Sequence, residues 1–223
     1  MDRRAESGDP ACGGCCGGVV PADLHRSGVG RIPQHLARHE ALSGADAAAD
    51  AIARRIRTIP DFPRPGIQFR DITTLILDPE GLRLSVEGMV AAVDGPIDLV
   101  AGIEARGFVF APAVALALGA GVILIRKDGK LPGATIAEDY ALEYGADRIA
   151  IHADACTPGA RVLLVDDLIA TGGTARAAVR LLRKAGAVVR QASFAIDLPD
   201  LGGADALRAD DIAVSALVAF PGH

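Results

Sequence analysis

One stretch, VLLVDDLIATGGTARAA at residues 162–178, constrains the fold of this chain more than any other. Four apolar residues precede two aspartates, a loop with two adjacent glycines follows, and the residues then take a helical pattern. This order predicts a buried strand, a tight loop and a helix. Backbone N–H groups at the start of such a helix favour anions. We therefore expect an α/β fold with an anion site at the carboxyl end of a strand.

Strands and helices alternate along most of the chain. We expect strands at residues 97–102, 121–127, 147–155, 161–167, 187–198 and 211–220, and helices at 44–59, 79–93, 108–118 and 174–185. This alternation predicts a mostly parallel twisted sheet flanked by helices. Prolines fix an irregular path that leads into an extended segment at 67–71, and the polar excursion at 128–145 is interpreted as a mobile lid.

The first 44 residues differ from the rest of the chain in composition and periodicity. Residues 1–44 are rich in Gly, Ala, Arg and His without a sustained period, which predicts a poorly ordered N-terminal extension. Residues 45–223 are expected to form one domain. A chain that starts near Ser43 is therefore expected to remain active.

Composition excludes several classes of function. A net charge of −5, a pI of about 5.5 and the absence of Trp argue against a nucleic-acid partner. The apolar runs are shorter than the ~18 residues that a membrane span needs. Three of the four cysteines lie in ACGGCCGG near the N-terminus and are interpreted as reduced thiols, because one CxxC without a second ligand pair is weak evidence for zinc. No signal-peptide core follows the basic start, so the expected compartment is the cytoplasm.

The glycine loop fits one terminal phosphate. The chain lacks both GxxxxGK[ST] and GxGxxG, which excludes a triphosphate P-loop and the dinucleotide fingerprint. Gly172 and Gly173 let the backbone curl, and Thr171 and Thr174 can donate hydroxyl hydrogen bonds. The adjacent acids would repel a phosphate unless a group lay between them, and a ribose ring fits that gap. The alternative is an acid pair that only caps the next helix.

These residues resemble the phosphoribosyl-pyrophosphate signature of the type I phosphoribosyltransferases. The segments PDFPRPGIQFRDIT, EARGF, LIRKDGKLPG and YALEYG resemble the members of that family that act on adenine, and the resemblance spans residues 51–220. It implies the type I phosphoribosyltransferase fold and a glycosyltransferase of purine salvage. Such an enzyme forms AMP and pyrophosphate from adenine and phosphoribosyl pyrophosphate.

The resemblance also implies residue roles for the phosphoribosyl half of the reaction. Asp166 and Asp167 would hold the ribose hydroxyls, and the 5′-phosphate would be held by Ala170, Thr171, Gly172, Gly173 and Thr174. The pyrophosphate would be bound by Arg106, Arg126, Lys127 and Lys130, with a cis peptide at Glu104–Ala105 in the loop before it. Mg²⁺ would be held mainly by substrate oxygens and water, so no metal-ligating side chain is assigned.

The purine would be read largely by backbone groups. Phe69 would stack on adenine, while the backbone of Gln68 and Arg70 would address its edge. Leu168 would close the other ring face. Within the lid, Glu143 would handle the imidazole proton and act as a catalytic residue beside Asp166 and Asp167, and Tyr144 would pack against the ribose and base. The family also implies a homodimer in which some cations serve the neighbouring site.

Two alternatives stay open on sequence alone. One is a phosphoribosyltransferase for another base, such as xanthine or orotate. The other is a regulator that senses phosphoribosyl pyrophosphate without chemistry, although residues 1–44 show no helix-turn-helix pattern and ALEYG is intact.

Overall fold

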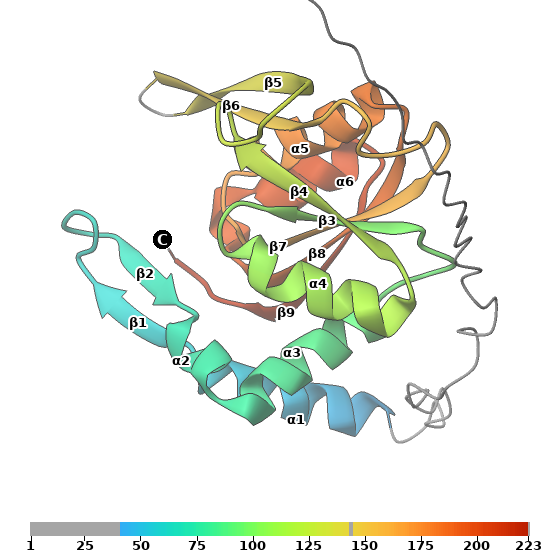
Figure 1. The fold of residues 1–223 in the computed structure, drawn as a ribbon. Helices are drawn as coiled ribbons and strands as arrows, with labels where there is room; N and C mark the ends of the chain where they lie inside the picture. Colours follow the sequence, from blue (N-terminus) through green and yellow to red (C-terminus); the bar gives the residue numbers. More distant parts are fainter. Residues whose placement is uncertain (1–40, 143–144, 223) are drawn as a thin grey trace, which may run out of the picture. The chain divides into compact units, whose positions relative to one another are not determined.

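Seven strands form one sheet in the order β5-β6-β4-β3-β7-β8-β9 (Figure 1). The computed structural model describes residues 41–142 and 145–222. The strands of this sheet are β3 (Leu99–Ile103), β4 (Gly121–Lys127), β5 (Thr135–Leu142), β6 (Gly145–His152), β7 (Arg161–Ile169), β8 (Val188–Asp197) and β9 (Ala213–Ala219). Strands β4, β3, β7, β8 and β9 run parallel, while β6 is antiparallel to both β4 and β5.

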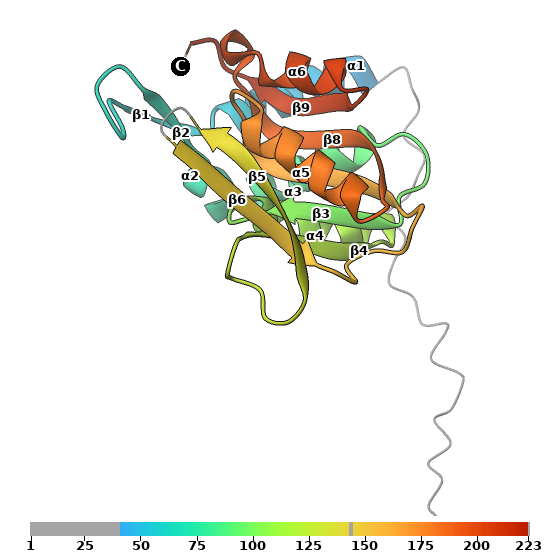
Figure 2. The same ribbon diagram turned by 90° about the horizontal axis from the view of Figure 1, so that it is seen from above.

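Helices cover both faces of the sheet. They are α1 (Ala41–Ala53), α2 (Thr73–Leu77), α3 (Pro79–Ala91), α4 (Gly107–Leu118), α5 (Gly173–Lys184), the 3₁₀ turn η1 (Pro199–Leu201) and α6 (Gly203–Ala209). Figure 2 shows α5 on the near side of the sheet and α3 and α4 behind it. A mostly parallel sheet with helices on both faces confirms the predicted architecture.

Strand β7 shows why both faces are apolar. Its buried residues alternate between two cores, because successive side chains of a strand point to opposite faces. Val162 and Leu164 pack in the core beneath α5 and α6, while Leu163 and Val165 pack with α3 and α4. The continuous apolar run is therefore that of a strand buried on both sides.

The N-terminal helix differs from the expectation at both ends. Helix α1 begins at Ala41, so residues 41–44 of the predicted extension belong to it, and it ends at Ala53 rather than near residue 59. Residues 57–60 instead form β1 (Arg57–Pro60), which pairs antiparallel with β2 (Gln68–Asp71) in a hairpin outside the main sheet. The β-branched Thr58 and Ile59 suit a strand better than a helix once a partner is present.

The polar excursion also differs from the expectation. Its second half is strand β5, which pairs with β6 from Thr135 opposite His152 to Leu142 opposite Gly145. Ile136 and Tyr140 lie four residues apart, so they share one face of the strand, and both pack on the core beneath α5. The charged residues between them concealed this two-residue period.

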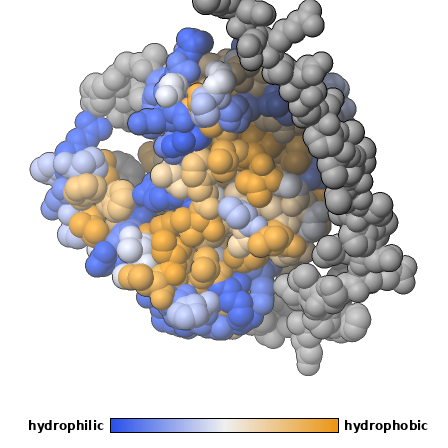
Figure 3. All heavy atoms as spheres, viewed as in Figure 1, coloured by the Kyte–Doolittle hydropathy of each residue, from blue (hydrophilic) through white to orange (hydrophobic). Residues whose placement is uncertain are grey.

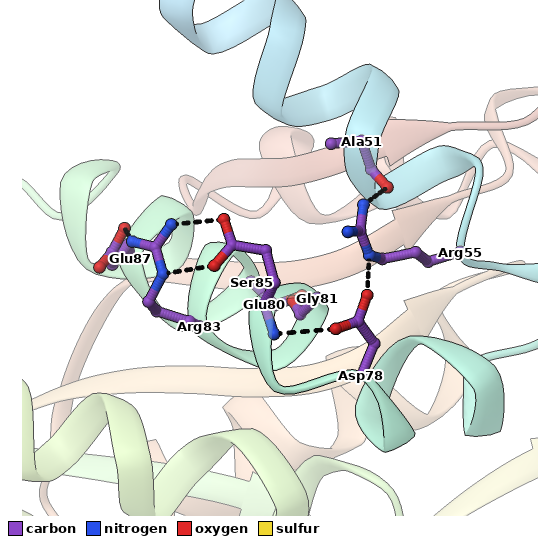
Figure 4. Close-up of polar contacts among 8 residues, drawn as sticks. All are labelled: Ala51, Arg55, Asp78, Glu80, Gly81, Arg83, Ser85 and Glu87. Carbon is purple, nitrogen blue, oxygen red and sulfur yellow. Dashed lines mark hydrogen bonds and ion pairs between the residues drawn. The ribbon is translucent and has the colours of Figure 1, made fainter.

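Polar contacts join α1 to the start of α3 (Figure 4). Asp78 caps α3 by accepting a hydrogen bond from the Glu80 N–H at 3.0 Å. The Arg55 guanidinium contacts the same carboxylate and also donates to the Ala51 carbonyl at 2.8 Å. These contacts fix the layer of helices that covers one face of the sheet.

None of the helices in the described part of the chain has the length and apolar character needed to cross a bilayer.

Candidate functional site

A pocket of about 610 Å³ opens at the carboxyl edge of the parallel strands. It is lined by Ile103, Glu104, Ala105, Arg106, Lys127, Tyr140, Asp147, and residues 166–175. Its walls come from the ends of β3, β4 and β7, from the β5–β6 pair, and from the loop that leads into α5. This edge is where open α/β sheets bind ligands.

The two aspartates at the end of β7 lie in this pocket but have different surroundings. Asp167 is almost completely buried, and its Oδ2 lies 2.8 Å from Nε of Arg106. Within the described residues that oxygen accepts no well-aligned hydrogen bond. Among the described residues, Asp166 accepts a hydrogen bond from the N–H of Asp167, at 2.8 Å, and from no other group. The carboxylates therefore keep unused hydrogen-bonding capacity, although Arg106 lies against Oδ2 of Asp167.

Burial raises the pKa of both carboxyls. Desolvation is the main cause for Asp166, and the neighbouring charge of Asp167 raises that pKa further. The pKa of Asp167 is also raised by burial, although the Arg106 guanidinium opposes the effect. Hydroxyl donors or a cation brought by a ligand would stabilise the ionised pair.

The loop after β7 curls around an open space at the start of α5. Gly172 has a φ of +80°, a conformation that favours glycine, and it is the residue before the first turn of α5. A Cβ on Gly203 would lie only 2.2 Å from the Ala170 oxygen and 2.6 Å from the Gly172 nitrogen. The Gly203 N–H donates to that same oxygen at 2.9 Å. The start of α6 thus supports the loop from behind through backbone contacts.

Arg106 stands between the pocket and the β1–β2 hairpin. It follows the cis peptide at Glu104–Ala105, which the resemblance implies, and precedes α4. Its guanidinium carbon lies 5.6 Å from the centre of the Phe69 ring, within the range of a cation–π contact. The Phe69 ring meets Phe62 edge-on at 5.2 Å. The hairpin is therefore in contact with the acid pair through one arginine.

A second polar group lies across the pocket. Asp147, at the start of β6, accepts a hydrogen bond from the Tyr140 hydroxyl at 3.2 Å and forms an ion pair with Lys127, 3.3 Å from its Nζ. Glu104 accepts hydrogen bonds from the Lys127 N–H at 2.9 Å and from the Arg126 guanidinium at 3.2 and 3.3 Å.

The structure brings together many of the residues that the sequence predicts. The acid pair, Leu168, residues 170–174, Arg106 and Lys127 all line the pocket. Arg126 instead turns to Glu104 and to the Lys130 carbonyl, and Lys130 is exposed outside the lining.

The predicted adenine-reading residues lie in the hairpin rather than in the pocket wall. Gln68, Phe69 and Arg70 are half-buried on β2. The Arg70 side chain contacts Thr58 and the Phe220 ring, whose centre lies 4.5 Å from the guanidinium carbon, while the role expected of Arg70 uses its backbone. Glu143 and Tyr144 lie outside the described residues.

Sequence reasoning missed the polar residues Glu104, Tyr140 and Asp147 of this site and the glycine behind its loop. These three polar side chains line the pocket, and Gly203 supports the loop. No cluster of three or more His, Cys, Asp or Glu side chains suited to a metal occurs among the described residues.

Comparisons with known proteins agree with this geometry. Residues 87–215 match the family model described as a phosphoribosyl transferase domain. An adenine phosphoribosyltransferase of a Bradyrhizobium species is 60% identical over 173 residues, which cover 77% of this chain and 97% of the relative.

Solved structures give the same result. The adenine phosphoribosyltransferase of Rhodothermus marinus matches with a TM-score of 0.74 at 46% identity, over 78% of this chain and 99% of that one. The enzyme of Saccharomyces cerevisiae, complexed with an imino-altritol bisphosphate and adenine, matches with a TM-score of 0.71 at 34% identity, over 77% and 99% of the two chains.

Proposed function

This chain belongs to the adenine phosphoribosyltransferase family, whose members are pentosyltransferases, and we propose that the pocket at the carboxyl edge of its sheet carries out the transfer. In this reaction N9 of adenine forms a bond to C1 of the ribose, and the bond from C1 to the pyrophosphate oxygen breaks. The products are AMP and pyrophosphate. The observation that carries the proposal is the acid pair of β7 in one pocket with the glycine loop that opens α5.

The loop and the acids bind different parts of the phosphoribosyl group. Backbone N–H groups of residues 170–174 and the start of α5 suit the 5′-phosphate. Asp166 and Asp167 accept hydrogen bonds from the ribose hydroxyls and face the positive charge that grows on the ring as the pyrophosphate leaves. Arg106 and Lys127 suit the departing pyrophosphate, because cations stabilise its developing charge.

Arg106 has a second task in this proposal. In the structure it contacts Asp167, whose oxygens the ribose requires, and it also lies over Phe69. Transfer of its guanidinium from Asp167 to the pyrophosphate would free the acid for the ribose. Phe69 then stacks on adenine with Leu168 on the opposite ring face, and the backbone of Gln68 and Arg70 reads the edge of the base.

The proton on the adenine imidazole needs an acceptor during attack. The role of Glu143 in accepting it, and the packing of Tyr144 beside the ribose, rest on the resemblance of ALEYG to the family's lid sequence. Removal of that proton increases the nucleophilicity of the ring nitrogen.

The charges of the pocket fit Mg²⁺. Four carboxylates, from Glu104, Asp147, Asp166 and Asp167, stand against two cationic side chains among the described lining residues, with Arg126 pairing Glu104 from outside the lining, and the substrate itself is a polyanion. When bound to substrate oxygens, Mg²⁺ would supply positive charge to the leaving pyrophosphate. Because the described residues offer no three-ligand cluster, substrate and water would complete most of its coordination.

One exposed apolar face of this domain suits the interface of a homodimer. Figure 3 shows hydrophobic residues gathered over α4 and β4. They include Leu116, 84% exposed, together with Val109, Val122 and Leu124. Within the described part of the chain, residues 121–125 of β4 pair with β3 on one side and lack a partner on the other, since β6 joins β4 at Arg126 and Lys127. A second copy would cover this face, next to the segment that carries Arg126 and Lys130.

The experiment that tests the reaction is base competition. Purified protein would be given phosphoribosyl pyrophosphate, Mg²⁺ and adenine, hypoxanthine, guanine, xanthine or orotate, with nucleotide formation followed for each base. We expect AMP from adenine and little product from the others. Turnover on a 6-oxopurine without AMP formation would overturn the proposal, and ligand binding without turnover would favour a sensor. We also propose the cytoplasm as the compartment, as expected from the sequence.

A further inference from the structure

Two pocket residues, Tyr140 and Asp147, have no role in the mechanism above. A carboxylate is an unexpected neighbour for a polyanionic substrate, because it repels the phosphates that the pocket must hold. Glu104 is explained by the Arg126 guanidinium that it holds. Asp147 therefore needs an explanation of its own.

Both carboxylate oxygens of Asp147 are fixed by contacts. The Arg148 N–H donates to Oδ1 at 2.8 Å, the Tyr140 hydroxyl lies 3.2 Å from Oδ2, and Nζ of Lys127 lies 3.3 Å from that same Oδ2. The backbone hydrogen bond is the main cause that lowers the pKa of Asp147, so the group is ionised at neutral pH. A charged and oriented acceptor thus faces the one lysine among the described lining residues.

The tyrosine that holds this carboxylate is itself held firmly. Tyr140 stands directly opposite Asp147 in the β5–β6 pair, and its ring packs in the core beneath α5. Its hydroxyl also interacts with the side chain of Thr174, in the first turn of α5. Core packing therefore places the Tyr140 hydroxyl between Asp147 and the glycine loop of residues 170–174, called the phosphate loop below.

We propose that Asp147, oriented by Tyr140, is a positioning residue that sets the Lys127 ammonium at the pyrophosphate end of the pocket. This inference rests on the role proposed above for Lys127. A free lysine side chain has many rotamers, and a fixed carboxylate reduces the entropy lost when the ammonium meets its ligand. The gain from positioning outweighs the repulsion that the carboxylate adds.

The direction in which one substitution changes substrate binding and kcat/KM distinguishes a positioning role from a purely electrostatic one. Asp147→Asn keeps the shape and removes a negative charge from an anion pocket. If Asp147 acted only through its charge, the variant would bind phosphoribosyl pyrophosphate more tightly. If it positions Lys127, we expect kcat/KM for that substrate to fall about tenfold, with KM for adenine changed less than about twofold.

The double variant with Lys127→Met tests whether the effect passes through the lysine. Lys127→Met alone should lower kcat/KM for phosphoribosyl pyrophosphate about 30-fold. Adding Asp147→Asn should then cost no more than about twofold, because no ammonium remains to be positioned. Independent, additive losses would overturn the proposal.

Two further variants test the role of the tyrosine hydroxyl and provide a matched control. Tyr140→Phe keeps the core ring but removes the hydroxyl, and should give a smaller loss in the same direction, about threefold, with a similar melting temperature. Asp139→Asn is the matched control, because this exposed acid of β5 pairs only loosely with Arg148 at 3.7 Å. It should leave the kinetics unchanged.

The outcomes are distinguishable from failure of the proposed function. Absence of AMP formation by the unaltered enzyme would reject the function itself. An active enzyme whose Asp147→Asn variant has normal or improved kcat/KM would reject only the positioning role.

Discussion

Nε of Arg106 lies 2.8 Å from Oδ2 of Asp167, whereas the adjacent Asp166 makes no ion pair within the described residues. The two acids follow one another on β7, yet only one is neutralised in the structure. Burial nevertheless raises the pKa of both. The pair is therefore built at a cost to the empty fold, which a bound ribose would offset.

Asp166→Asn should impair turnover without harming the fold. We expect kcat/KM to fall about 10²-fold or more, roughly 3 kcal/mol, because the charge facing the developing cation is lost. The melting temperature at pH 7 should be unchanged or higher. Near-normal kinetics with a large fall in melting temperature would make the pair structural.

The pH dependence of that stability difference follows from the raised pKa of Asp166. A folded-state pKa above the unfolded value gives stability that is present at low pH and lost as the pH rises through the folded pKa. Any stability advantage of Asp166→Asn at pH 7 should therefore shrink as the pH falls through the raised folded-state pKa, and it should vanish below about pH 4, near the unfolded pKa. Thermal unfolding of the unaltered enzyme and of Asp166→Asn between pH 7 and pH 3 measures this difference in stability.

Asp71 should anchor the hairpin that carries the residues proposed to read adenine. Hydrogen bonds from the Thr73 hydroxyl and N–H are the main causes that lower the pKa of Asp71 to about 2, and hydrogen bonding by the Arg57 side chain contributes less. Its stabilising effect is present above the unfolded pKa and lost as the pH falls from about 4 toward 2.

Asp71→Asn should be less stable than the unaltered enzyme at pH 7, and the difference should narrow at pH 3. Urea unfolding at the two pH values measures this. Because β2 carries Gln68 and Phe69, KM for adenine should rise more than KM for phosphoribosyl pyrophosphate. Asp154→Asn, at an exposed acid far along the chain, serves as the control. A pH-independent difference would argue against the anchor.

Gly203→Ala should damage the phosphate loop from outside the pocket. Its Cβ would meet backbone atoms of Ala170 and Gly172, which cannot yield without moving the loop. We expect KM for phosphoribosyl pyrophosphate to rise about tenfold or more. Gly95→Ala, with a φ of +73° and open space around it, should lose stability through strain alone and keep its KM. Equal KM values for both variants would contradict the prediction.

Leu116→Asp should separate the proposed dimer. A charge at this exposed apolar residue would disfavour burial against a second copy. Analytical ultracentrifugation should show a dimer for the unaltered chain and a monomer for the variant. A monomeric unaltered chain would refute the proposal.

A chain that starts near Ser43 should keep its activity and a similar melting temperature. The Bradyrhizobium relative matches this chain over 97% of its own length while covering only 77% of this one. Removal of residues through Ile56 should instead destabilise the domain, because Ile52 and Ile56 are buried in the core with α3 and α4. Loss of activity in the shorter truncation would show that the N-terminal residues contribute to the site.

The sequence was most informative where the chemistry lies in consecutive residues. A strand, a glycine loop and a helix start are local features, and residues 162–178 hold all three in order. The acid pair and the phosphate loop therefore could be predicted from that stretch, and the alternation of elements predicted the sheet. The same logic failed at residues 54–59, where the expected helix instead gives way to β1, which pairs with the neighbouring strand β2.

Only the tertiary structure could identify Glu104, Tyr140, Asp147 and Gly203 as parts of the site. Tyr140 and Asp147 meet because β5 pairs with β6, and Gly203 meets Ala170 although 33 positions separate their numbers in the chain. Such contacts depend on how sheet edges and helix starts pack, which no local period encodes. By itself the sequence determined that an acid pair and a glycine loop stand together at the end of a strand, because these residues are contiguous. The packing of β5, β6 and α6 decided which further side chains face them.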